Sequence, residues 1–117
     1  TLYSNPPIHG ARIVAHVLSE HQLREVWERQ LREMCERINA MRHHLVERLK
    51  QKSHSADFNH LADCKGMFCY SGLSSEQVER IISEFGVYMT GDGRINVCGL
   101  NRENLDYVAE SILAVKK

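Results

Sequence analysis

One apolar stripe runs through the first half of the chain and constrains the fold more than any other feature. The stripe steps by three or four residues and consists of Leu23, Trp27, Leu31, Met34, Ile38, Met41, Leu45 and Leu49. This spacing places the side chains on one face of an α-helix. We therefore predict one long helix over residues 20–51, running about 45 Å at about 1.5 Å per residue. A helix of that length is typical of one that reaches beyond its own domain.

Three further helices are predicted from their spacing and their end signals. Apolar residues recur at helical spacing over residues 8–18. Ser74 and Gln77 form a capping-box pattern at the start of a helix that Gly86 ends. Asn101 is placed to cap a final helix.

The segments between these helices have the character of strands. Residues 66–73, bounded by glycines, and residues 87–90 are each predicted to be a strand. A glycine-rich turn at 91–93 leads into a third strand at 94–99, and residues 58–61 are predicted to be irregular or a short edge strand. The fold class is therefore α+β: a small, partly antiparallel sheet covered by helices.

Composition excludes several classes of partner. The 117 residues include 15 basic and 15 acidic side chains, so no net charge draws the chain toward nucleic acid. No apolar run approaches the roughly 20 residues that span a bilayer, so no membrane partner is expected. The cysteines Cys35, Cys64, Cys69 and Cys98 form no C-x-x-C pair. We expect reduced thiols and no metal, with a disulfide framework or a zinc site as the alternatives.

The residues alone give few signs of an autonomous enzyme site. The patterns G-x-x-x-x-G-K-[ST], H-E-x-x-H and G-x-S-x-G are absent. One candidate is Arg94, which follows the glycine turn and opens an apolar strand. An arginine held on rigid backbone can bind a carboxylate through two parallel hydrogen bonds. The alternative is a surface arginine paired with a nearby acid.

Four stretches together resemble, in order and spacing, the C-terminal part of the aspartate aminotransferase family, which is of the fold-type I, class I, pyridoxal-phosphate-dependent type. They are residues 3–7 (YSNPP) with 10–15 (GARIVA), 66–73 (GMFCYSGL), 85–89 (FGVYM) and 93–100 (GRINVCGL). The resemblance extends from Tyr3 to Val115. It implies that this chain is the C-terminal part of such an enzyme and contains its small domain.

The resemblance also implies roles for individual residues. Arg94 falls where the family holds the arginine that binds the substrate α-carboxylate, and Phe68 would line the same pocket. Ser4 and Asn5 match a loop that crosses toward the partner's active site in the family's dimer, and Ser4 would lie near the partner's cofactor phosphate. The family's Schiff-base lysine lies upstream of the matched segment, so no catalytic residue is expected in this chain.

For the whole protein, the resemblance implies a homodimeric enzyme that uses pyridoxal phosphate. It would exchange an amino group between the amino acid L-aspartate and the 2-oxo acid 2-oxoglutarate, giving oxaloacetate and L-glutamate. Residues 1–18 would end the large cofactor-binding domain, and residues 19–117 would form the small domain. We expect the chain to be a C-terminal fragment that is inactive alone and binds no cofactor. An intracellular location is expected, with the mitochondrial matrix favoured over the cytoplasm.

Two alternatives remain open at this stage. An aromatic amino-acid aminotransferase shares the neighbourhood of Arg94, and the residues that decide between the two specificities would lie upstream of Thr1. A non-enzymatic α+β module that binds an amino acid or a partner helix is the other alternative. In that case the stripe between Leu23 and Leu49 would be an exposed dimer face.

Overall fold

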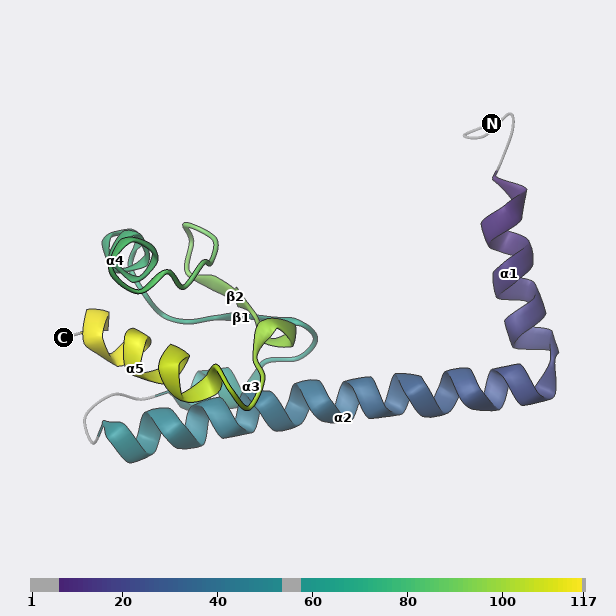
Figure 1. Cartoon of the computed structure of the whole chain (residues 1–117), viewed down its shortest axis with the longest axis horizontal. Helices are drawn as coiled ribbons and strands as arrows, with labels where there is room; N and C mark the ends of the chain where they lie inside the picture. The colour runs from purple at the N-terminus through teal and green to yellow at the C-terminus, as the bar shows by residue number, and fades with distance from the viewer. Residues whose placement is uncertain (1–6, 54–57, 117) are drawn as a thin grey trace. The chain divides into compact units, whose positions relative to one another are not determined.

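Helices form most of the computed structural model, which describes residues 7–53 and 58–116 (Figure 1). The described elements in chain order are α1 (Ile8–Ser19), α2 (His21–Lys52), α3 (Asn59–Asp63), β1 (Phe68–Tyr70), α4 (Ser75–Phe85), β2 (Arg94–Asn96), the 3-10 turn η1 (Val97–Gly99) and α5 (Leu105–Lys116). The predicted long helix and the α+β class are confirmed. Within the described ranges, no helix is both long and apolar enough to cross a bilayer.

The chain divides into two units, and the first comprises residues 1–36. Its described part consists of α1 and the first half of α2, which are separated at Glu20, where the backbone is extended. The stripe is exposed here: Leu23, Trp27, Leu31 and Met34 keep 41–54% of their surface. None of the residues of α1 is buried. The predicted division into residues 1–18 and 19–117 stays a prediction.

The second unit, residues 37–117, contains the apolar core. The remaining part of the stripe turns inward here, where Met41, Leu45 and Leu49 are 7%, 1% and 0% exposed. They belong to one cluster with side chains from the other elements of the unit, among them Phe58, Leu61, Val78, Ile81, Ile95, Val97, Ala109, Ile112 and Val115. One helical pattern thus has a buried half and an exposed half.

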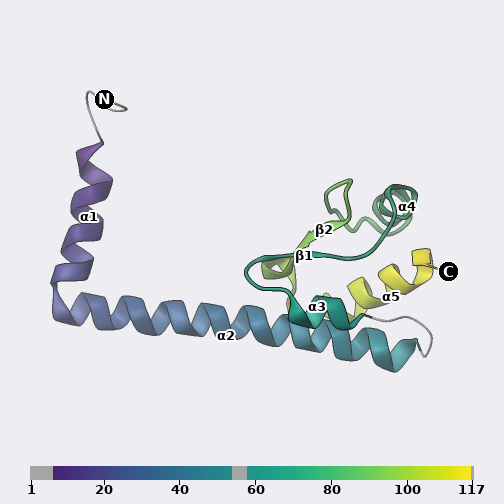
Figure 2. The same ribbon diagram turned by 180° about the vertical axis from the view of Figure 1, so that it is seen from behind.

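The end of α2 and the helix α5 are joined by ion pairs and run in the same direction (Figures 1 and 2). Arg48 contacts Asp106 at 3.0 Å, and Lys52 contacts Glu110 at 2.6 Å. From the first ion pair to the second, the residue number rises by four in both helices, which is about one helical turn, so the two helices run parallel.

The sheet consists of β1 and β2, which pair antiparallel. The predicted capping box is confirmed: Ser74 N–H donates to Gln77 at 2.9 Å, and Gln77 N–H donates to the Ser74 hydroxyl at 3.3 Å. Gly86 ends α4 in the left-handed conformation, as predicted. Asn101 also caps as predicted, because its side chain accepts from the backbone N–H groups of Glu103 and Asn104 ahead of α5.

Three strand predictions need correction. Residues 58–61 are not an edge strand, because Phe58 is fully buried and the helix α3 begins directly after it. Residues 87–90 are not a strand either, since the N–H of Val87 still bonds to the end of α4 at Ile81. The strand predicted over 94–99 ends at Asn96, whose side chain accepts from Cys98 N–H at 3.0 Å and starts η1.

Candidate functional site

The two-stranded sheet has one buried and one exposed face, and the predicted substrate residues lie on the exposed face. Tyr70 is paired with Arg94, and Phe68 is paired with Asn96. Side chains alternate along a strand, so these four residues share a face while the residue between them on each strand is buried. The exposed face therefore carries one cation, two aromatic rings and one amide.

Arg94 and Phe68 are brought together by the register of the strands. The guanidinium carbon of Arg94 lies 6.0 Å from the centroid of the Phe68 ring, at the outer limit of a cation–π contact. The Arg94 side chain is 46% exposed, and Phe68 is also exposed. A charged fork held beside a ring is thus accessible from solvent.

Asp92 is the acidic partner of Arg94. One carboxylate oxygen of Asp92 accepts from the backbone N–H of Arg94 at 3.2 Å, and the other lies 3.4 Å from a guanidinium nitrogen. The hydroxyl of Thr90 lies within hydrogen-bond reach of Asp92 and of the Arg94 carbonyl. The hydrogen bond from Thr90, followed by that from the Arg94 amide, lowers the pKa of Asp92. The acid pairing considered as the alternative for Arg94 is therefore present, but exposed and long, and such pairs contribute little.

Gly93 fixes the backbone from which Arg94 extends. Its φ is +82°, and a Cβ built there would lie 2.9 Å from the Leu73 carbonyl oxygen. The Gly93 carbonyl accepts from the Ser71 backbone at 2.8 Å and from the Ser71 hydroxyl at 2.7 Å. Ser71 is fully buried, and its hydroxyl oxygen also accepts from Leu73 N–H at 3.3 Å. These contacts hold the residue before Arg94 against the segment that follows β1.

This arrangement is suited to binding a carboxylate. The planar guanidinium of Arg94 can donate two parallel hydrogen bonds to one carboxylate. Hydrogen bonds to charged groups are each worth about 1.5–3 kcal/mol. The exposed contact with Asp92 is weak by comparison, so an incoming carboxylate with better geometry can replace it.

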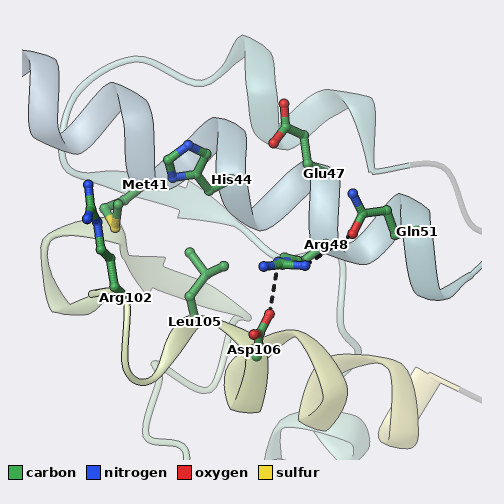
Figure 3. A pocket seen from close by; sticks show the side chains of 8 residues that line it. All are labelled: Met41, His44, Glu47, Arg48, Gln51, Arg102, Leu105 and Asp106. Carbon is green, nitrogen blue, oxygen red and sulfur yellow. Dashed lines mark hydrogen bonds and ion pairs between the residues drawn. The ribbon is translucent and has the colours of Figure 1, made fainter.

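A groove lies between α2 and α5 and differs in character from the exposed sheet face (Figure 3). This groove of about 470 Å³ is lined by Met41, His44, Glu47, Arg48, Gln51, Arg102, Leu105 and Asp106. The ion pair between Arg48 and Asp106 bridges it, with a side-chain hydrogen bond from Arg48 to Gln51. Arg48 and Asp106 neutralise each other there, so we assign no binding function to it.

Comparison with known proteins identifies the family. The model of the family described as aminotransferase class I and II matches residues 1–112. The chain belongs to the class I and II aminotransferase family. It is 49% identical over 115 residues to the aspartate aminotransferase of Haemophilus influenzae, and 47% identical over 116 residues to the mitochondrial aspartate aminotransferase of Xenopus tropicalis. It spans 29% of the former protein and 27% of the latter.

Solved structures of aminotransferases share the fold of this chain. An aromatic-amino-acid aminotransferase from Burkholderia pseudomallei, covalently bound to pyridoxal phosphate, matches with a TM-score of 0.94 and 53% identity. This match covers 98% of this chain and 29% of that one. A mitochondrial aspartate aminotransferase from Trypanosoma brucei matches with a TM-score of 0.93 and 41% identity, covering 99% of this chain and 30% of that one.

Of the residues predicted for an aminotransferase site, Arg94 and Phe68 lie together, whereas Ser4 and Asn5 lie outside the described residues. Sequence reasoning missed the supporting residues Thr90, Asp92 and Ser71. Thr90 and Asp92 could have been found, because they flank a glycine in a turn directly before Arg94. Ser71 gave no signal, since its contact with Gly93 is made across 22 residues.

Proposed function

We propose that this chain forms the α-carboxylate-binding part of an aminotransferase active site. Arg94 would hold the carboxylate of the amino acid, and Phe68 would line the same pocket. One observation carries the proposal: a half-exposed guanidinium extends beside an aromatic ring from a strand whose start is fixed by buried hydrogen bonds. The two relatives named aspartate aminotransferases support L-aspartate and 2-oxoglutarate as the substrates, with oxaloacetate and L-glutamate as products.

The cofactor of the whole enzyme would be pyridoxal phosphate, which supplies an electron sink when bound. The exposed sheet face carries Phe68, Tyr70, Arg94 and Asn96, none of which is a lysine that could anchor the cofactor. This face therefore fits the substrate and not the cofactor. The proposal places the cofactor outside this face, with no catalytic residue in this chain. The loop of Ser4 and Asn5 would reach toward the partner's active site, with Ser4 near the partner's cofactor phosphate.

An aromatic amino-acid aminotransferase is the second candidate. The observation in its favour is the 53% identity to the aromatic-amino-acid aminotransferase of Burkholderia pseudomallei over 98% of this chain. All amino-acid substrates share the α-carboxylate, so Arg94 would have the same role in either enzyme. The two candidates differ in what binds the substrate side chain.

The proposal extends to how this chain fits into the whole protein. Residues 1–18 would complete the large domain, residues 19–117 would form the small domain, and the enzyme would be a homodimer. The exposed apolar side chains of Leu23, Trp27 and Leu31 support this, because exposed apolar patches mark surfaces that contact other protein. An intracellular location, with the mitochondrial matrix ahead of the cytoplasm, stays a prediction.

Transamination by the full-length protein tests this proposal. Purified protein with pyridoxal phosphate would receive 2-oxoglutarate with L-aspartate, L-tyrosine or L-phenylalanine, and formation of L-glutamate would be followed. We expect the highest specificity constant with L-aspartate. A higher value with the aromatic donors would favour the second candidate, and no transfer from any donor would contradict both. Residues 1–117 alone should show neither cofactor absorbance nor turnover.

A further inference from the structure

Two thiols meet behind the candidate site, where α3 packs against β1. Cys64 follows the last residue of α3, and its Sγ donates to the carbonyl of His60 at 3.3 Å. Cys69 is the central residue of β1, and its Sγ is directed to the next carbonyl, that of Leu61, at 4.0 Å. The two thiols are thus directed to the carbonyl groups of consecutive residues in α3. The Cys64 thiol is also near enough to raise the pKa of Cys69.

The loop between the two cysteines is held in place by Arg42. Gly66 has a φ of +79°, which turns the chain back from α3 into β1. The Arg42 guanidinium donates to the carbonyl of Gly66 and, at 2.8 Å, to the side-chain oxygen of Asn39. Arg42 is only 3% exposed, so this clamp is part of the buried structure. The approach of Cys64 to Cys69 therefore depends on the packing of the unit.

The surroundings give the two thiols different reactivity. Cys64 is half-buried and can be reached from solvent, whereas Cys69 is 2% exposed. Burial, followed by the neighbouring Cys64 thiol, raises the pKa of Cys69, and Arg42 opposes this, first as a hydrogen-bond donor and then through its charge. The Nε of Arg42 has no acceptor among the described residues. The raised pKa keeps Cys69 in the thiol form, and the buried cation of Arg42 limits that rise.

We propose that Cys64 and Cys69 form a redox-active thiol pair that reacts with hydroperoxides. Cys64 is the attacking thiol: its sulfur takes one oxygen of the peroxide, the O–O bond breaks, and an alcohol or water leaves. Cys69 is the resolving thiol: its sulfur attacks the Cys64 sulfenic acid, the S–O bond breaks, and the hydroxide leaves as water with the proton of Cys69. Two thiols are oxidised to one disulfide, and one peroxide is reduced.

The disulfide would tie the end of α3 to the strand that carries Phe68. Cys69 is the β1 residue between Phe68 and Tyr70 and pairs with Ile95 in β2. Oxidation would therefore act on the back of the sheet whose front holds Arg94. The reaction itself requires only the two thiols and Arg42, so it does not depend on the proposed aminotransferase activity.

Peptide mapping of the full-length protein tests this proposal. The protein would be treated with hydrogen peroxide, blocked with iodoacetamide and digested with trypsin without reduction. Trypsin cleaves after Lys65, between the two cysteines, so the disulfide would join the peptides 53–65 and 66–80. We expect this linked pair to appear with peroxide, about 2 Da lighter than the sum of its two free-thiol peptides, and to separate after dithiothreitol. Two unlinked peptides, or Cys64 linked to another cysteine, would overturn the proposal.

Single variants separate the roles of the two thiols. In Cys69→Ser, Cys64 should stop at the sulfenic acid and be trapped by dimedone. In Cys64→Ser, the shielded Cys69 should react at least about tenfold more slowly than Cys64 does in the wild type. Cys35→Ser is the matched control, because Cys35 is exposed and lies on α2 within the other unit. The linked pair should form unchanged in that variant, and its loss there would also contradict the assignment.

Discussion

Replacing Gly93 with alanine tests how the start of β2 is fixed. Gly93 combines a φ of +82° with a site for Cβ only 2.9 Å from the carbonyl oxygen of Leu73. That oxygen belongs to the backbone and cannot rotate away. A second atom, the Ser71 hydroxyl oxygen, would lie 3.2 Å from the added carbon. Gly93→Ala should therefore introduce both a backbone strain and a steric clash.

Two other glycines separate these contributions. Gly86 has a φ of +63° and open space around its Cβ site, so Gly86→Ala measures the strain alone. Gly91 has open space and no positive φ, so Gly91→Ala measures the alanine itself. We expect Gly91→Ala to lie between neutral and about 1 kcal/mol stabilising, and Gly86→Ala to destabilise by about 1 kcal/mol. Gly93→Ala should destabilise by about 2–4 kcal/mol, because overpacking adds about 1–3 kcal/mol to the strain.

The assay is urea unfolding of the three variants and the wild type, followed by far-UV circular dichroism. A change in midpoint at constant slope reports a change in the free energy of unfolding. From the most to the least stable variant, the predicted order is Gly91→Ala, Gly86→Ala and Gly93→Ala. If Gly93→Ala were no more destabilising than Gly86→Ala, the close packing of Gly93 against Leu73 would be refuted.

Three further predictions concern the same unit. The pKa of Asp92 is lowered on folding, so its contribution to the free energy of unfolding is present above the unfolded pKa and is lost as pH falls through the folded pKa. The difference in stability between wild type and Asp92→Asn should therefore shrink from pH 7 to about pH 3. Ser71→Ala should cost about 1–3 kcal/mol in urea unfolding, because Leu73 N–H loses its buried acceptor. Leu49→Ala should lower the free energy of unfolding of residues 37–117 by about 2–5 kcal/mol. Leu23 is 41% exposed, so Leu23→Ala should leave the urea midpoint of residues 37–117 unchanged.

The helices could be predicted from sequence because their signals are local. The stripe through Leu45 and Leu49 has helical spacing, and Ser74 and Gln77 are near enough in sequence to cap one another. What the spacing could not tell is which half of the stripe is buried. That depends on the core of residues 37–117, to which Leu49 belongs and Leu23 does not.

The strands were harder to predict because their limits depend on side-chain and backbone contacts that residue type does not reveal. A single side chain ended one of them: Asn96 bonds to the backbone two residues later and starts a turn. Phe58 is a residue type that is typical of strands, yet it is buried in the core and lies directly before the helix α3. For the site, the family resemblance predicted that Arg94 and Phe68 lie close together, as they do in the structure. The buried contact from Ser71 to Gly93 could be found only in the folded chain.

The most direct test of the account compares Arg94→Lys with Arg80→Lys in the full-length enzyme. The two arginines are matched: their side chains are 46% and 48% exposed, and each has one acidic partner. Lysine keeps the charge but cannot donate two coplanar hydrogen bonds to a carboxylate. Loss of about 2–4 kcal/mol of transition-state binding lowers kcat/KM roughly 30- to 800-fold, and L-aspartate and L-glutamate should suffer alike. We predict this fall in kcat/KM for Arg94→Lys at unchanged stability, and a kcat/KM near the wild-type value for Arg80→Lys. Unchanged kinetics in Arg94→Lys together with a lower unfolding midpoint would make Arg94 a structural residue and contradict the account.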